Sequence, residues 1–317
     1  MGSCRRGDPR GDVPPHDVTS ADVIATEALT KFYGRRRGIE DVTFQVERGE
    51  VFGFLGPNGA GKTTTMRTLL DFLRPTRGRA SLFGLDSREA GVEIRRRVGY
   101  LPGELALYEH MTAEDHLRYL GNLRGGADRP AIRHLAQRLD CELSRRIEDL
   151  SRGNKQKVGV IQAFMHRPDL LILDEPTAGL DPLLQHEVHG LIAEARSDGR
   201  TVFLSSHILP EVEALCDRVG IIRRGRLAAV ERIDALKQRA IRRLEIHFAE
   251  PVPEAEFRTL TGVRDVVSRD GVVRCTVTGS LDAVIKAAAA HTVVNVVSHE
   301  PSLEEIFLEY YGDGVAP

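Results

Sequence analysis

The sequence predicts an α/β protein with a mixed-sheet core, a mostly helical subdomain and a small α+β domain toward the C-terminus. Three observations support this fold class. Residues 56–63 read G-x-x-x-x-G-K-[ST] and lie between a strand-like and a helix-like segment, which is the arrangement of a phosphate-binding loop. Residues 170–173 are consecutive apolar side chains, typical of a central parallel strand that is covered on both faces. From residue 236 the pattern becomes β-α-β-β-α-β, which fits a ferredoxin-like domain.

The composition indicates which classes of partner and which cellular compartment to expect. The 317 residues are enough for two domains, and 44 Lys plus Arg against 46 Asp plus Glu give a net charge of −2. This balance argues against a nucleic-acid partner held by bulk electrostatics. The four cysteines lack metal or redox spacing, as in reduced cytoplasmic thiols, and we find neither an apolar run of about 20 residues nor a secretory signal. We therefore expect a cytoplasmic protein whose membrane role, if it has one, needs another chain.

The N-terminal segment leads into the first strands. Residues 1–21 are rich in Gly, Pro, Asp and Arg, which predicts a disordered tail. Strands are expected at 23–26 and 42–46, with a basic turn at 35–38 between them. Tyr33 is placed on a loop shortly before the phosphate-binding loop. Its ring could stack on an adenine or be an ordinary half-buried loop aromatic, and the residues alone leave both alternatives open.

The phosphate-binding loop gives each residue type a physical task. Its glycines let successive backbone N–H groups face one anion, and a helix that begins near Lys62 adds its dipole and its free N–H groups. Lys62 can reach the β- and γ-phosphates, and the Thr63 hydroxyl can hold Mg²⁺. The flanks agree, because 50–55 reads as a buried strand and 64–73 as a helix that Pro75 ends. The residues predicted to bind nucleotide here are Gly56, Pro57, Asn58, Gly59, Ala60, Gly61, Lys62, Thr63 and Thr64.

A mostly helical insertion comes after two further strands. Strands are expected at 78–84 and 98–101, and the pattern is helical over about 104–167 apart from a Gly/Asp/Pro break. Within this insertion, Ser151 and Gly153 stand just ahead of a helix, where an N-terminus can bind an anion. An ordinary N-cap explains the same residues, and the local sequence favours that simpler alternative.

The ends of two later strands carry candidate catalytic residues. Asp174 and Glu175 follow the apolar run, at the edge of the sheet where open α/β proteins bind ligands. Asp174 would reach Mg²⁺, directly or through water, and Glu175 would polarise an attacking water. His207 follows the next strand, 201–206, and could hydrogen-bond a γ-phosphate. Acidic residues also end strands as turn formers, and a lone loop histidine is usually solvated. The preceding phosphate-binding loop favours the functional alternative.

Two stretches complete the chain. Asp181 closes a tight turn ahead of a helix that begins near residue 182, and a hairpin is expected over 219–229. The segment 236–317 is predicted to be the small α+β domain, ending in a helix at 302–309 whose Ser302 and Glu305 make a capping box. No catalytic constellation stands out in this last segment.

The order of these features is more specific than any one motif. The chain over residues 22–232 resembles the nucleotide-binding subunit of an ABC transporter, through Tyr33, the loop 56–63, the Leu-Ser-x-Gly stretch at 150–153, Asp174-Glu175, Asp181 and His207. Residues 301–307 are similar to the C-terminal domain of the drug and antibiotic exporter branch, the daunorubicin-type ATPases. The resemblance implies a P-loop NTPase fold, ATP and Mg²⁺ as cofactors, and ATP hydrolysis coupled to transport.

The resemblance also implies partners. In the family, two subunits sandwich two ATP molecules head to tail. The phosphate-binding loop, Asp174, Glu175 and His207 of one subunit would face Ser151 and Gly153 of the other, and Asp181 is assigned to the same site. Such a homodimer would dock on separately encoded transmembrane permease subunits at the inner face of the cell membrane. The implied function is export of a drug, antibiotic or lipid-like molecule.

Two positions depart from the family pattern. Arg152 replaces the first glycine of the signature Leu-Ser-Gly-Gly-Gln and must tolerate the backbone shape of a glycine. Gly103 replaces a glutamine that follows Leu-Pro, so we consider Glu104 as a substitute metal ligand. One alternative is a soluble ABC-type ATPase acting on ribosomes or DNA, which the balanced charge and the single nucleotide domain disfavour. Another is a non-hydrolysing ATP-binding regulatory module, against which Asp174, Glu175 and His207 argue.

Overall fold

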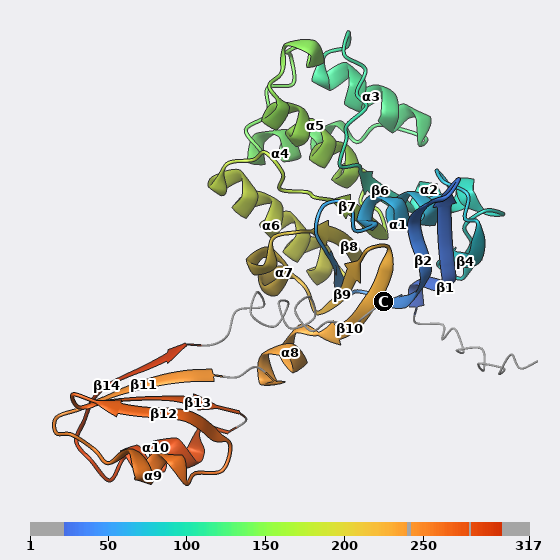
Figure 1. The fold of residues 1–317 in the computed structure, drawn as a ribbon. Helices are drawn as coiled ribbons and strands as arrows, with labels where there is room; N and C mark the ends of the chain where they lie inside the picture. Colours follow the sequence, from blue (N-terminus) through green and yellow to red (C-terminus); the bar gives the residue numbers. More distant parts are fainter. Residues whose placement is uncertain (1–21, 240–241, 279, 300–317) are drawn as a thin grey trace, which may run out of the picture.

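The computed structural model describes residues 22–239, 242–278 and 280–299 (Figure 1). Two of its β-sheets pack against each other through a cluster of aromatic rings. The ring of Phe44, from the first sheet, lies 5.5 Å from the rings of Phe52 and Phe54 and 5.6 Å from that of Phe203 in the second. All four side chains are buried. Rings at these separations contribute both buried area and specific stacking, so the cluster fixes how the two sheets meet.

The two sheets differ in strand direction. The first is antiparallel with the order β2-β1-β4-β5, comprising β1 (Asp22–Tyr33), β2 (Arg36–Glu47), β4 (Arg77–Leu82) and β5 (Leu85–Asp86). The second has the order β10-β9-β3-β8-β7-β6, in which only the edge strand β10 runs antiparallel to its neighbour. Its strands are β3 (Val51–Leu55), β6 (Val98–Leu101), β7 (Leu170–Asp174), β8 (Thr201–Ser206), β9 (Arg218–Arg223) and β10 (Arg226–Arg232). This confirms the predicted mixed sheet.

Burial on both faces explains the apolar run in β7. Leu170 and Ile172 point into the core that contains the aromatic cluster, whereas Leu171 and Leu173 point into a second core on the other face. A strand covered on both sides needs no polar alternation, as the sequence indicates. The strand order also places the carboxyl ends of β3, β8 and β7 next to one another, and the loops that follow these strands carry the candidate site.

Helices cover the sheets and build a separate lobe. The lobe contains α3, α4 and α5, which lie within the segment 104–167, and extends beyond the sheet edge (Figure 1). Within the described ranges, no helix is both long and apolar enough to span a bilayer. The helices of this part are α1 (Lys62–Leu69), α2 (Gly91–Arg97), α3 (Ala113–Leu123), α4 (Arg129–Arg138), the 3₁₀ turn η1 (Ile147–Asp149), α5 (Arg152–Phe164), α6 (Pro182–Ser197), α7 (Leu209–Leu215) and α8 (Ile233–Arg239).

Two local predictions near the phosphate-binding loop were wrong. Tyr33 is the last residue of β1 rather than a loop residue, and the expected basic turn shrinks to two residues because Arg36 already pairs with Tyr33. Gly34, with φ of 60°, makes this tight hairpin turn possible. The helix begins at Lys62, as expected, but it ends at Leu69 although the helical pattern continues to residue 73. Asp71 takes a left-handed φ of 57° and terminates it well before the proline.

The C-terminal unit has its own sheet and core. It contains β11 (Arg242–Phe248), α9 (Glu254–Arg258), β12 (Val263–Arg269), β13 (Val272–Val277), α10 (Asp282–Ala288) and β14 (Val293–His299). The strands form an antiparallel sheet in the order β12-β13-β11-β14, around buried side chains such as Ile246 and Phe257. The element order is the predicted one, and assignment to the ferredoxin-like class stays a prediction. The tail at 1–21 and the helix expected at 302–309 lie outside the described residues.

Candidate nucleotide-binding and hydrolytic site

The loop after β3 has the backbone geometry of an anion site. Gly59 and Gly61 adopt φ of 79° and 116°, conformations that are readily available only to glycine. Gly61 is the N-cap of α1 and provides no side-chain cap, and the first turn of α1 carries no acidic residue. The free N–H groups and the positive end of the helix dipole therefore face the loop, where they can bind a phosphate.

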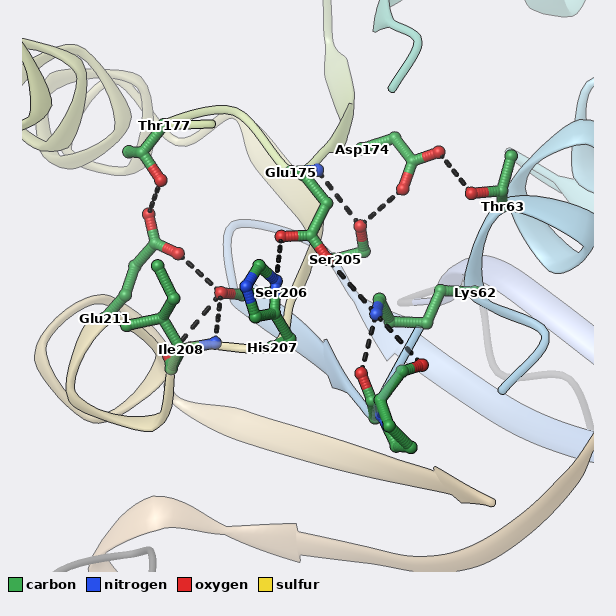
Figure 2. A network of polar contacts seen from close by, with 12 residues as sticks. Lys62, Thr63, Asp174, Glu175, Thr177, Ser205, Ser206, His207, Ile208 and Glu211 are labelled. Atoms are coloured by element: carbon green, nitrogen blue, oxygen red, sulfur yellow. Dashed lines mark hydrogen bonds and ion pairs between the residues drawn. The ribbon is translucent and has the colours of Figure 1, made fainter. Parts of the chain in front are cut away.

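Lys62 is held between two loops of the site. Its side chain is buried, and Nζ donates to the carbonyl oxygens of Gly56 at 2.6 Å and Pro57 at 3.4 Å. Nζ also lies 3.1 Å from Glu175 Oε1, as an ion pair without hydrogen-bond geometry (Figure 2). The ammonium thus stands between the phosphate-binding loop and the loop after β7, where a bound phosphate would find a cation.

Asp174 and Thr63 place two hard oxygen ligands together. Asp174 is 1% exposed, and its Oδ2 accepts a hydrogen bond from Thr63 Oγ1 at 2.6 Å. Its Oδ1 accepts from Ser205 Oγ, also at 2.6 Å. A carboxylate and a hydroxyl are ligands that Mg²⁺ prefers. This pair is the metal candidate of the site. The described ranges contain no group of three or more His, Cys, Asp or Glu side chains that could hold a metal ion.

Glu175 and His207 contact each other directly. His207 Nδ1 lies 2.7 Å from Glu175 Oε2, and the histidine ring is about half exposed (Figure 2). Glu175 has a left-handed φ of 54°, and its backbone N–H is directed at Ser205, toward Oγ at 3.1 Å and the carbonyl oxygen at 3.3 Å. The strained backbone aims the carboxylate at Lys62 and His207, which is the kind of arrangement found at functional sites.

The loop after β6 approaches the metal candidate without contributing a side chain. A Cβ atom added to Gly103 would lie 3.1 Å from Asp174 Oδ2, so glycine permits this close approach. Glu104 is exposed, and among the described residues no contact joins it to Thr63 or Asp174. The geometry therefore does not support the predicted role of Glu104 as a metal ligand.

A cavity of about 480 Å³ adjoins the phosphate-binding loop, within the usual size range of ligand sites. Tyr33, 44% exposed, stands at this cavity with its ring against Gly38, where an added Cβ would come within 2.8 Å of Tyr33 Cε2. An aromatic ring here can cover the base of a nucleotide whose phosphates lie in the loop. The cavity is lined by Tyr33, Arg36, Arg37, Gly38, Gly59, Gly61, Lys62, Thr63 and Thr64.

Ser151, Gly153 and Asp181 lie at helix N-termini and make no contact with the Lys62–Glu175 pair within the described chain. Ser151 Oγ accepts from the N–H of Asn154 at 3.3 Å and caps α5, as the simpler alternative predicts. Asp181 caps α6 in the same way. Arg152 is the first residue of α5 and has no left-handed φ, so the strain expected from replacing a glycine does not arise.

Two residues that support the site, Ser205 and Gln156, were not predicted from the sequence. Ser205 connects the Asp174 side chain to the Glu175 backbone. Only the pairing register of β7 and β8, which places Ser205 beside Asp174, could have indicated this role. Gln156 Nε2 donates to the carbonyl oxygens of Pro176 at 3.1 Å and Glu175 at 3.4 Å, and so supports the loop from α5. No pattern in the sequence marks this second residue.

Comparison with known proteins agrees with the geometry. The family model described as ABC transporter matches residues 39–178. The bacitracin transport ATP-binding protein BcrA of Bacillus licheniformis is 35% identical over 304 residues, which cover 92% of this chain and 98% of that protein. The chain belongs to the ABC transporter ATP-binding proteins. The linearmycin resistance ATP-binding protein LnrL of Bacillus subtilis is 30% identical, covering 92% of this chain and 98% of LnrL.

Solved structures agree with this family assignment. The ATP-binding subunit of an ABC transporter superposes with a TM-score of 0.63 at 35% identity, covering 68% of this chain and 92% of that one. A dimeric ATP-binding cassette bound to ADP and phosphate superposes with a TM-score of 0.61, and at 21% identity it supports the fold alone. The predicted ABC fold and ATPase function are therefore confirmed. The chain is an ATP-binding, ATP-hydrolysing ABC transporter subunit, and the soluble alternative is disfavoured.

Proposed function

We propose that this ABC subunit powers the export of a drug, antibiotic or lipid-like molecule through separately encoded membrane subunits. The relatives named for bacitracin transport and linearmycin resistance align over 92% of the chain, which includes the C-terminal unit as well as the ATP-binding part. The observation that carries the hydrolytic half of the proposal is the contact of Glu175 with both His207 and Lys62 beside the phosphate-binding loop.

The proposed roles follow from the geometry. The backbone N–H groups of 56–64 bind the phosphates, Lys62 neutralises the β- and γ-phosphate charge, and Tyr33 covers the adenine. Glu175 polarises the attacking water, and His207, which contacts Glu175 at 2.7 Å, holds the γ-phosphate. Most of the catalytic effect then comes from positioning and charge neutralisation, since phosphoryl transfer needs little covalent help.

The residues present fit a divalent cation. Thr63 and Asp174 supply a hydroxyl and a carboxylate already within 2.6 Å of each other, at the start of α1 and the end of β7. We propose that these two residues hold Mg²⁺. When bound, the ion neutralises phosphate charge. Ser205 orients the Asp174 carboxylate through its second oxygen.

We further propose that the chain acts as a homodimer on the inner face of the membrane. Ser151 and Asp181 are exposed at the N-termini of α5 and α6, and within the described residues they make no contact with Lys62 or Glu175. In a head-to-tail sandwich, Ser151 and Gly153 would complete the partner's nucleotide site, and Asp181 would lie at the same interface. A Glu175→Gln variant should accumulate as a dimer with ATP and revert to monomer with ADP, as measured by sedimentation velocity. ATP-independent behaviour would contradict the sandwich.

Hydrolysis by the purified chain tests the proposed site. The parent should release phosphate from ATP only with a divalent cation. Lys62→Ala should lose ATP binding because it removes the buried ammonium that lies against the phosphate-binding loop. Lys286→Ala is a matched control, since Lys286 pairs with Asp282 in the C-terminal unit. Equal ATP affinity in parent and Lys62→Ala would contradict the proposal.

A further inference from the structure

A buried carboxylate lies behind the Glu175–His207 pair. Glu211, on α7, is 6% exposed and accepts hydrogen bonds from Thr177 Oγ1 at 2.8 Å and Ser206 Oγ at 2.6 Å. A third group, His189 Nε2 of α6, lies 3.2 Å from Glu211 Oε1. Figure 2 shows Thr177, Glu211 and Ser206 as one connected series of contacts that ends beside His207.

The two hydroxyl donors belong to the two loops that meet at the site. Thr177 lies two residues after Glu175, and Ser206 directly precedes His207. Ser206 Oγ also accepts from the backbone N–H of Ile208 at 3.0 Å, so both neighbours of His207 are tied to the same hydroxyl group. Thr177 and Ser206 are themselves buried. Glu211 therefore connects the loop that carries Glu175 to the loop that carries His207.

A carboxylate suits this junction chemically. An ionised carboxylate only accepts hydrogen bonds and has about four lone-pair sites, enough for the three donors that converge here. Burial alone would raise the pKa of Glu211, but hydrogen bonds from His189, Ser206 and Thr177 hold its pKa below the usual range. Hydrogen bonds from hydroxyls to an ionised oxygen are short and strong, particularly away from water.

We propose that Glu211 is a positioning residue for ATP hydrolysis, which maintains the contact between Glu175 and His207 by holding one residue on each loop. The inference rests on the proposed roles of Glu175 and His207. Glu211 acts through Thr177 and Ser206 rather than on the nucleotide. Replacing Glu211 should therefore slow the chemical step. ATP binding, which depends on the loop after β3, should stay nearly unchanged.

The first test compares isosteric variants. Glu211→Gln keeps the volume but removes the charge and turns one acceptor oxygen into a donor, so one of the two hydroxyls must change from donor to acceptor and both lose an ionised acceptor. We expect kcat to fall at least about tenfold with the KM for ATP within about twofold. Glu194→Gln, an exposed carboxylate on α6, is the control and should match the parent. Equal losses in kcat and ATP affinity, or an unchanged kcat, would overturn the proposal.

Thr177 provides a second test that does not remove the buried carboxylate. Thr177→Val deletes only the hydroxyl donor, whereas Thr177→Ser retains it, so the first variant should lose activity and the second should keep it. Because both changes break the same connection, adding Thr177→Val to Glu211→Gln should lower kcat by less than about twofold more. Full additivity of the two losses would refute a shared positioning role.

An NMR measurement separates this inference from the proposed function. Because His207 contacts Glu175, replacing Glu175 by Gln should shift the His207 ring signal in the parent background. In the Glu211→Gln background, the chemical-shift change of the His207 ring caused by Glu175→Gln should be less than half of that in the parent background. The comparison decides the inference even if the parent hydrolyses no ATP, an outcome that would count against the proposed function alone. An equal response in both backgrounds would contradict a positioning role for Glu211.

Discussion

Ser205 is the residue whose removal most directly tests the internal support of the site. Its side chain is fully buried at the end of β8. The hydroxyl donates to Asp174 Oδ1 at 2.6 Å and accepts from the Glu175 N–H at 3.1 Å, so one oxygen holds both acidic residues. Ser205→Ala removes this oxygen without adding volume.

The expected loss of stability follows from these two contacts. A hydrogen bond to a charged group contributes roughly 1.5–3 kcal/mol, and the Asp174 carboxylate loses one such bond while keeping that from Thr63. The Glu175 N–H keeps the Ser205 carbonyl oxygen at 3.3 Å, so its loss is below about 1 kcal/mol. The free energy of unfolding should therefore fall by about 1.5–4 kcal/mol.

Urea unfolding followed by circular dichroism measures this change. Ser197→Ala serves as the control, because Ser197 is exposed at the end of α6 and should alter stability by less than about 0.5 kcal/mol. If Ser205→Ala proved as mild as the control, the hydrogen bonds to Asp174 and Glu175 would not support the site as described.

Three further predictions concern the loop, the metal and pH. Gly61→Ala should abolish ATP binding in calorimetry, because it combines a φ of 116° with a Cβ only 2.8 Å from Ile39 Cγ2. Gly59→Ala, with open space around the added Cβ, should be milder, and equal effects would contradict this prediction. Chelation of divalent cations by EDTA should stop phosphate release, and hydrolysis that continues would argue against a metal at Thr63 and Asp174. Burial and nearby Arg124 lower the pKa of His166 to about 4, so the histidine stays neutral in the folded protein. Because the unfolded chain takes up this proton near pH 6.5, the contribution of His166 to stability is fully present above pH 6.5 and is lost as the pH falls from 6.5 toward 4. The free energy of unfolding, measured with urea at a series of pH values, should fall by about 3 kcal/mol over this range in the parent, and this fall should disappear in His166→Gln. The same pH dependence of stability in parent and variant would contradict the prediction.

The sequence was sufficient for the elements whose signals are local. The phosphate-binding loop, the apolar strand 170–173 and the acidic pair after it were found because residue type and backbone requirement coincide within a few positions. Glu175 and His207 were each singled out as site residues at the ends of strands, but their direct contact was not predicted. Such features depend on chain order and backbone chemistry, which the sequence displays directly.

Contacts between distant segments were not foreseen. The Thr177–Glu211 hydrogen bond joins residues 34 apart, and the Ser205–Asp174 bond joins residues 31 apart, so neither leaves a periodic signal. The error at 64–73 has a local cause, because the left-handed conformation of Asp71 competes with helix continuation and no proline or glycine marks it. Glu104 was predicted as a metal ligand but is exposed and does not contact Thr63 or Asp174 in the described residues. Sequence spacing alone does not specify the direction of a side chain.

The proposed role of Glu175 in the chemical step, rather than in ATP binding, can be tested directly in one experiment. ATP occupancy and phosphate release are measured on the same samples of parent and Glu175→Gln, at saturating ATP with Mg²⁺. We expect equal occupancy, and phosphate release reduced by at least about a hundredfold in the variant, a barrier increase of roughly 2.7 kcal/mol or more. Phosphate release at the parental rate in Glu175→Gln, or a rate loss explained by lost occupancy, would contradict it.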